Sequence, residues 1–179
     1  MIKNITAMPC FYLMALLAVL MAACSPVPFN KVEIKTDNLI AGKSIGLLNC
    51  RYRLLAVNDT RPDGSRAGGL GLNKLSFAEP ADYVKAQLYK AGMLPANASD
   101  GRNVVVDIKH VYLNQNNVTK IPTVVYEVQI NESDKFIIRG QIASMNWNAS
   151  ANEAYDAFAD AFQSANAQLI TKLNKSCVN

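Results

Sequence analysis

The amino-acid sequence predicts an α+β fold: a mainly antiparallel sheet of four to five strands with two amphipathic helices packed on one face. Two observations lead to this prediction. Apolar and polar residues alternate along residues 103–112 and 123–130, which is typical of half-buried strands. Residues 81–91 and 154–173 instead repeat apolar residues at helical spacing, so each has one apolar stripe to bury. The expected order of elements is β(β)αβββα.

The first 23 residues differ from this domain. Lys3 precedes an uncharged, apolar run over residues 10–23, which is too short to span a bilayer and has the layout of a secretory signal peptide. Removing the signal leaves 156 of the 179 residues, enough for one modest domain. We expect residues 1–23 to be a lipoprotein signal peptide, residues 24–30 a lipidated Cys with a short tether, and residues 31–179 a single periplasmic α+β domain.

The end of this signal resembles a lipobox, the site where bacterial lipoproteins are acylated on a Cys and cleaved just before it. The matching residues are Ala22, Ala23, Cys24 and Ser25, although Met21 stands where Leu is usual. Acyl chains on Cys24 would hold the domain on a membrane. Ser25, rather than Asp, resembles the sorting pattern of outer-membrane lipoproteins, so we expect an anchor in the outer membrane, facing the periplasm of a Gram-negative bacterium. The alternative is a plain cleaved signal with an incidental Cys.

Two cysteines then remain in the mature domain, Cys50 and Cys177, because Cys10 leaves with the signal and Cys24 carries lipid. In an oxidising periplasm such a pair is more often a disulfide than two free thiols. The disulfide would join the C-terminal tail to an early strand. Two free thiols are the alternative, and a redox-active pair has little support because the sequence has no Cys-x-x-Cys spacing.

The first strands are expected at 31–35 and within 44–57. Residues 58–73 are rich in turn formers and show no alternation, so they predict a long loop, and long loops in small domains are often functional. The charged residues of this loop are Asp59, Arg61, Asp63 and Arg66. The spacing fits neither a calcium loop nor a phosphate loop. We predict either a loop that contacts a partner or ligand, or a solvated surface loop.

The first helix follows this loop. Ser76 and Glu79 have the spacing of a capping box, and Pro80 fits the first helical turn. Gly92 comes directly after the last apolar residue of the stripe, where a left-handed residue commonly ends a helix. The sequence therefore predicts a helix that ends just before Gly92.

Three strands are expected next, with the return strand over residues 135–147. Their alternation predicts an antiparallel meander with one solvent-exposed face. The side chains expected to share the buried face of the first of these strands are Val104, Val106, Ile108 and Tyr112.

Ser150 and Glu153 form a second capping box, which predicts the start of the longest helix, ending near Lys175. Acidic residues early and lysines late in this segment suit the helix dipole. Its apolar stripe consists of Ala154, Phe158, Ala161, Phe162, Ala165, Leu169 and Leu173. We expect this stripe to pack on the sheet.

The residues indicate no enzyme. His110 is the single histidine, so a metal site made of several histidines is excluded, and any Ser-His-Asp arrangement would need His110 within a strand. Glu132 and Asp134 fall in an expected hairpin turn, where exposed acids are ordinary. We expect no catalytic activity, no cofactor and no metal, and the net charge of +4 gives no reason to expect nucleic-acid binding.

Several of these features together resemble the YajG-like family of uncharacterised bacterial lipoproteins. They are the lipobox, the short tether, the Val-Asn-Asp-Thr-Arg-Pro-Asp stretch at residues 57–63, the helix after it, the three-strand meander and an Ala-rich last helix. The resemblance covers roughly residues 32–173. It implies an outer-membrane lipoprotein without an established catalytic activity, and Cys24 is the one functional residue that it carries over.

We therefore expect a lipid-anchored periplasmic lipoprotein without catalytic activity that binds an envelope protein partner, in assembly or maintenance of a cell-envelope complex. The alternative is an accessory lipoprotein of an envelope transport system that binds lipid or a small apolar ligand, which predicts an apolar groove between sheet and helices. A third class, a cell-wall hydrolase, would need an acid or a nucleophile in a pocket.

Overall fold

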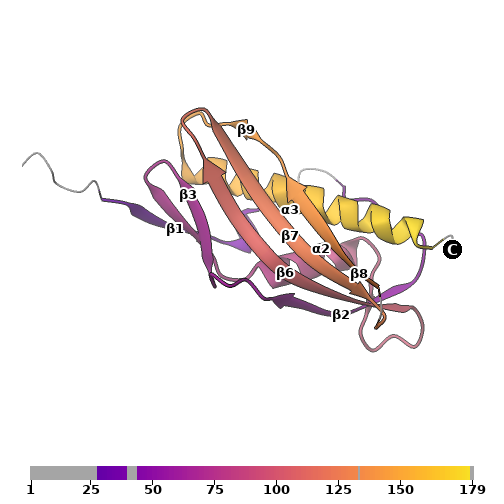
Figure 1. The fold of residues 1–179 in the computed structure, drawn as a ribbon. Coiled ribbons are helices and arrows are strands. Elements are labelled where there is room, and N and C mark those ends of the chain that lie inside the picture. Colours follow the sequence, from indigo (N-terminus) through magenta and orange to yellow (C-terminus); the bar gives the residue numbers. More distant parts are fainter. Residues whose placement is uncertain (1–27, 40–43, 133, 178–179) are drawn as a thin grey trace, which may run out of the picture.

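A three-strand antiparallel meander forms the centre of the fold in a computed structural model that describes residues 28–39, 44–132 and 134–177. Its strands β6 (Arg102–Gln115), β7 (Thr119–Ile130) and β8 (Asp134–Gln141) pair in sequence order (Figure 1). The short strand β9 (Ser144–Met145) pairs with the beginning of β7. The predicted meander is therefore present, but its last expected strand is split into two.

The remaining strands make the sheet mixed. Strand β6 pairs in parallel with β2 (Tyr52–Asp59) along its first half and with β3 (Arg66–Leu70) near its end. Strand β4 (Asn73–Phe77) is antiparallel to β3 and parallel to the edge strand β1 (Asn30–Ile34), which leads into the short 3-10 helix η1 (Thr36–Asn38). Strand β5 (Leu94–Pro95) adds to β2. The described residues thus form a nine-stranded mixed sheet, and the predicted four to five mainly antiparallel strands were wrong.

Of the missed strands, β3 lies within the predicted long loop at residues 58–73, and β4 begins at the last residue of that loop. Gly68 has a positive φ of 89°, and a Cβ added there would lie 2.2 Å from the carbonyl oxygen of Leu113. Its lack of a side chain lets β3 come this close to β6, so this glycine serves strand pairing rather than loop flexibility. Residues 44–50, expected to be strand, form none; the N–H of Leu48 instead donates to the carbonyl oxygen of Ala91 at 2.9 Å.

A β-bulge in β6 changes which side chains face the core. Ile108 and the two valines expected to share its face are fully buried, but the pairing with β7 shifts between Ile108 and His110. The extra residue reverses the alternation. Val111 and Leu113 consequently face the core, and the prediction that Tyr112 would do so was wrong.

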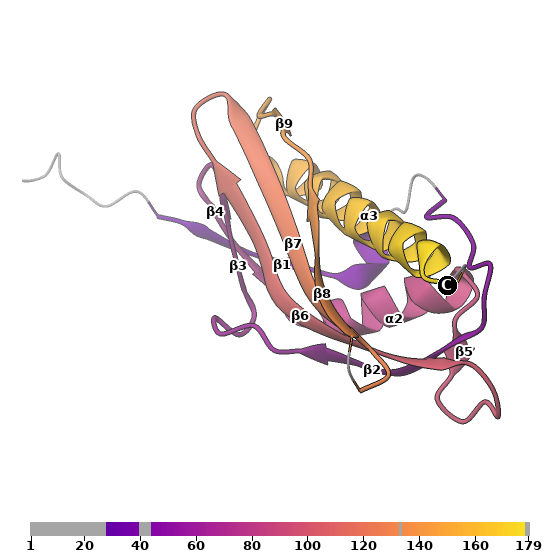
Figure 2. The same ribbon diagram turned by 45° about the vertical axis from the view of Figure 1, so that its right-hand side comes forward.

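Both helices, α2 (Pro80–Lys90) and α3 (Ala151–Lys175), lie on the same face of the sheet (Figures 1 and 2). The ring of Phe77 in β4 packs edge-on against Phe158 and Phe162 of α3, with centroids 5.9 and 5.5 Å apart. Tyr83 of α2 packs against Phe162 at 5.2 Å. All seven residues of the predicted α3 stripe are buried, so aromatic and aliphatic side chains fill the space between the sheet and the helices.

The two predicted capping boxes have different outcomes. Ser150 caps α3, because its hydroxyl accepts the N–H of Glu153 at 3.3 Å, and α3 ends at Lys175 as expected. Ser76 instead lies within β4, and the N-cap of α2 is Glu79, whose side chain makes no capping hydrogen bond. The first box was therefore wrong, although α2 itself forms where its apolar stripe placed it.

The chain enters and leaves this fold at opposite ends. Pro28 is the first described residue and lies two residues before β1, while the C-terminal end of α3 lies at the other end of the molecule (Figures 1 and 2). The predicted signal peptide and Cys24 lie outside the described residues. Among the described residues, neither helix is long and apolar enough to span a membrane.

Candidate functional site

The face of the sheet that points away from the helices is a candidate binding surface. Side chains of β6, β7 and β8 that alternate with the buried ones point to this side. Cross-strand pairing places Asp107 beside Glu127 and Glu127 beside Ile137. We call this surface the open face; its members are Asp107, Lys109, Glu127, Lys135, Ile137 and Arg139.

The charges of the open face pair loosely. The ammonium of Lys109 lies 3.6 Å from the carboxylate of Asp107 and 3.8 Å from that of Glu127, and Lys135 lies 3.7 Å from Glu127. Partly exposed pairs of this kind contribute about 0–1 kcal/mol each. Ile137 is 58% exposed next to them. A docking protein could therefore displace these pairs at little cost while it covers an apolar side chain.

His110 belongs to the same surface. Its ring stacks on that of Tyr112, with centroids 5.5 Å apart and planes at 23°. Burial lowers the pKa of His110, and the positive charge of Arg139 lowers it further, against an opposing effect of Asp63. The imidazole is therefore uncharged at neutral pH, and it extends the open face as a flat aromatic side chain.

The four charged residues of the predicted loop divide into an ion pair between the partly exposed Asp59 and the buried Arg61, and two exposed residues that form a second pair in the sequence. The guanidinium of Arg61, which is only 2% exposed, donates to both carboxylate oxygens of Asp59 at 2.7 and 2.6 Å and to the carbonyl oxygen of Phe77 at 2.7 Å. Burial alone would raise the pKa of Asp59, but its hydrogen bonds with Arg61 lower it. Asp63 and Arg66 are exposed. The first pair therefore ties the turn to β4, and the second remains accessible.

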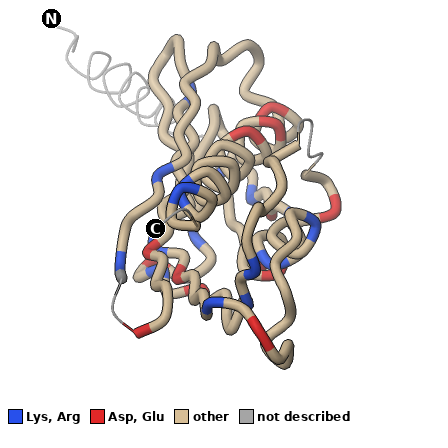
Figure 3. The backbone as a smooth tube through the Cα atoms, turned by 90° about the vertical axis from the view of Figure 1, so that its right-hand side faces the viewer, with Lys and Arg blue, Asp and Glu red and all other residues tan. Residues whose placement is uncertain are grey.

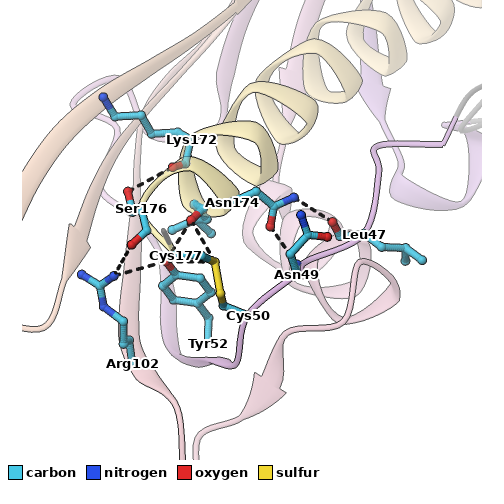
Figure 4. Close-up of a disulfide and its surroundings, with 10 residues drawn as sticks. Leu47, Asn49, Cys50, Tyr52, Arg102, Lys172, Asn174, Ser176 and Cys177 are labelled. Atoms are coloured by element: carbon cyan, nitrogen blue, oxygen red, sulfur yellow. Dashed lines mark hydrogen bonds between the residues drawn. A yellow bond between two sulfur atoms is a disulfide. The ribbon is translucent and has the colours of Figure 1, made fainter. Parts of the chain in front are cut away.

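Cys50 and Cys177 are joined by a disulfide, as predicted, with Cα atoms 6.0 Å apart (Figure 4). Beside it, the hydroxyl of Tyr52 donates to the carbonyl oxygen of Leu173 at 2.9 Å. Arg102 donates to the carbonyl oxygen of Ser176 at 2.9 Å. These contacts attach the end of α3 to β2 and β6, so the disulfide belongs to a structural connection.

A buried ion pair lies at the opposite end of α3 from the disulfide, and the sequence did not indicate it. The ammonium of Lys120 lies 2.7 Å from a carboxylate oxygen of Glu153, with side chains 6% and 14% exposed, and it also donates to the carbonyl oxygen of Met145. Glu153 accepts the N–H groups of Trp147 and Asn148 at 2.8 and 3.1 Å. Burial raises the pKa of Glu153, but these hydrogen bonds together lower it to about 2. The pair fixes the segment between β9 and α3.

The described residues include no group of three or more His, Cys, Asp or Glu side chains placed to hold a metal ion. An open groove of about 360 Å³ lies outside the core, between α3 and β8. Its lining includes Ile138, Gln168, Lys172 and Lys175. This groove combines an apolar floor with two cationic side chains at its rim.

No family model and no curated protein matches the chain. The chain is similar to several solved structures, each with little sequence identity. One is an uncharacterized protein, with 10% identity, 84% of this chain and 99% of that chain covered, and a TM-score of 0.44. A Xanthomonas campestris protein of the DUF330 family has 13% identity, 83% and 94% coverage and a TM-score of 0.41.

A hypothetical protein from Chlamydia trachomatis has 10% identity, 73% of this chain and 100% of that chain covered, and a TM-score of 0.38. None of these names states a function. The similar structures thus include uncharacterised bacterial proteins, and the finer resemblance to the YajG-like family stays a prediction.

Proposed function

We propose that this chain is a lipid-anchored lipoprotein of the outer membrane that faces the periplasm and binds an envelope protein partner, without catalytic activity of its own. The lipobox at Cys24 and the resemblance to YajG-like lipoproteins support the anchor. The open face supports partner binding, because Ile137 is 58% exposed within a row of charges of both signs. The partner would act with this domain in assembly or maintenance of a cell-envelope complex.

The composition of the open face supports a protein partner in particular. Its acidic side chains, Asp107 and Glu127, lie side by side on β6 and β7, and its basic side chains lie around them on β6 and β8. A complementary surface therefore has to match this pattern of charge, which favours specificity over affinity. Ile137, His110 and Tyr112 supply apolar and aromatic area next to those charges. Asp63 and Arg66 of the neighbouring turn are exposed and could extend the contact, which keeps part of the predicted partner-binding loop in the proposal.

The alternative, a transport accessory that binds lipid or a small apolar ligand, has less support. It required an apolar groove between the sheet and the helices, and there Phe77, Phe158 and Phe162 are fully buried against one another. The groove beside α3 lies outside this core and carries Lys172 and Lys175 at its rim. A ligand there would have to be an amphiphile with an anionic group.

Site-specific photo-crosslinking tests the partner proposal. The chain would carry a photoreactive phenylalanine analogue in place of Ile137, in Gram-negative cells that produce the acylated protein. A matched control carries the analogue in place of Tyr89, which is 37% exposed on α2. We expect a crosslinked protein from position 137 that is absent from position 89. No adduct at position 137, or the same adducts at both positions, would contradict binding through the open face.

The anchor is tested separately by the intact mass of the protein purified from membranes. Acylation predicts a mature chain that begins at Cys24 and carries the mass of the attached lipid. Replacement Cys24→Ala should abolish both the cleavage before this residue and the added mass. A mature chain that begins elsewhere and carries no lipid would contradict the lipoprotein assignment.

A further inference from the structure

Five large apolar side chains are exposed together at the end of the molecule where the described chain begins. They come from four different segments: the residue before β1, the β3–β4 turn, the β6–β7 turn and the β9 region. We call this surface the anchor-end tip; its members are Phe29, Leu72, Val118, Met145 and Trp147, which are 54%, 50%, 61%, 52% and 77% exposed. Single exposed apolar residues are ordinary, but a group of this size marks an interaction surface.

Hydrogen bonds hold the segments of the tip together. The N–H of Asn30 donates to the carbonyl oxygen of Leu72 at 2.9 Å, and that of Asn146 donates to the carbonyl oxygen of Val118 at 2.8 Å. Gln115 accepts from both the N–H of Gly71 at 2.7 Å and the amide of Asn146 at 3.3 Å. Figures 1 and 2 show the same arrangement: the start of β1, the β3–β4 and β6–β7 turns and β9 share one end of the sheet.

The charge of the tip differs from that of the rest of the molecule. Residues 67–75, 113–126 and 140–152, which form its turns and the adjoining strands, contain no acidic residue. Lys31 and Lys74 lie side by side on β1 and β4, and the ammonium of Lys74 lies 4.5 Å from the ring centroid of Phe29. The end that carries the C terminus instead displays charges of both signs (Figure 3).

Apolar and aromatic side chains beside lysines, with the neighbouring Glu153 carboxylate already paired to Lys120, match the chemistry of a phospholipid bilayer surface. Trp and Phe rings partition to the headgroup region, and lysines attract lipid phosphates. The buried Lys120–Glu153 pair supports this surface from below, because Glu153 accepts the N–H of Trp147 and so orients its segment.

The position of the predicted lipid agrees with this chemistry. Cys24 precedes Phe29 by five residues, and five residues of chain reach at most about 18 Å. If Cys24 is acylated, the tip is therefore the part of the domain that the anchor holds nearest to the bilayer. We propose that the anchor-end tip inserts its exposed apolar side chains into the headgroup region of that membrane, so that it orients the domain on the bilayer. This inference rests on the proposed lipid anchor.

Trp147 is the only tryptophan in the chain and provides the test. The acylated protein would be reconstituted into vesicles of phosphatidylethanolamine and phosphatidylglycerol that contain a lipid spin-labelled near the headgroup. We expect blue-shifted emission from Trp147, loss of intensity in the spin-labelled vesicles, and protection from iodide. The control combines Trp147→Phe with Tyr89→Trp, which moves the tryptophan to the other end of the molecule; its emission should stay open to iodide and insensitive to the spin label.

The outcomes separate this inference from the anchor on which it rests. A protein whose mass includes the acyl chains, but whose Trp147 is quenched by iodide and not by the lipid, overturns the tip contact and leaves the lipoprotein assignment intact. Protection from iodide without quenching by the lipid indicates that a second copy covers the tip, which also overturns the contact. A protein that carries no acyl chains overturns both proposals.

Discussion

Replacement Gly140→Ala tests how closely α3 packs on the sheet. Gly140 lies in β8 directly beneath the helix, and a Cβ added there would lie 2.1 Å from the carbonyl oxygen of Ala161 and 2.5 Å from the backbone nitrogen of Ala165. Ordinary contacts begin at 3.4 Å, so the separation would have to widen by about 1.3 Å. Both obstructing atoms belong to the helix backbone, so no side-chain rotation relieves the overlap.

The free energy of unfolding should fall by about 3 kcal/mol, the upper part of the usual range for an overpacked core. For a domain of this size that corresponds to a Tm lower by about 6–12 °C. Thermal unfolding followed by circular dichroism, with the disulfide intact, measures the shift. Gln141→Ala is the matched control, because this neighbouring side chain is exposed and its loss should change the free energy of unfolding by less than about 0.5 kcal/mol.

The expected loss of stability depends only on the close approach of α3 to Gly140. Gly140 does not have a positive φ, so its backbone conformation accepts alanine. Without the overlap, Gly140→Ala would stabilise the protein by about 0.4–1 kcal/mol, because alanine restricts the unfolded chain. A variant as stable as the original protein would therefore refute the close packing of α3 on β8.

Three further perturbations follow from the ion pairs and the disulfide. Replacement Cys177→Ser removes a disulfide that joins residues 127 positions apart. The free energy of unfolding, measured by urea unfolding, should fall by up to about 5 kcal/mol. An unchanged free energy of unfolding would contradict a stabilising disulfide. Asp59→Ala leaves the buried guanidinium of Arg61 without its carboxylate. Because Asp59 itself is 27% exposed, we expect a cost of about 1–3 kcal/mol, whereas Asp63→Ala at an exposed position should cost less than about 0.5 kcal/mol; equal effects would refute the division of these charges. The pKa of Glu153 falls from 4.5 to about 2 on folding. Its contribution to the free energy of unfolding is therefore complete above pH 4.5 and is lost as the pH falls toward 2. Replacement Glu153→Gln should flatten the pH dependence of the free energy of unfolding over this range.

The elements that the sequence predicted correctly depend on local periodicity. The stripe of α3 repeats over the whole helix, and Ser150 lies three residues before Glu153, so one short window contains all the information needed. The alternation of β7 is equally local. These signals identify an element and its buried side without reference to its neighbours in space.

The features that were missed depend on contacts between distant segments. Gly68 resembles a loop residue until β6 is seen to lie against it, and the bulge beside His110 is set by the pairing with β7. Arg61 was expected at an exposed position because charged residues usually are, and only its contact with Phe77 shows that it is buried. Lys120 and Glu153 are 33 residues apart, and no spacing rule links them.

The tip and the open face together constrain how a partner would approach the proposed lipoprotein. Strands β6 and β7 begin or end at the tip, and β6 has 14 residues, so it extends about 45 Å from that end. With the tip on the bilayer, the sheet stands away from the membrane and the open face points sideways, along the membrane surface rather than toward the periplasmic interior. Within β8, Arg139 lies nearer to the tip than Lys135, because the end of β8 pairs with the first part of β7. A partner that covers the open face therefore lies alongside the domain above the same membrane, where another membrane-bound envelope protein can reach it.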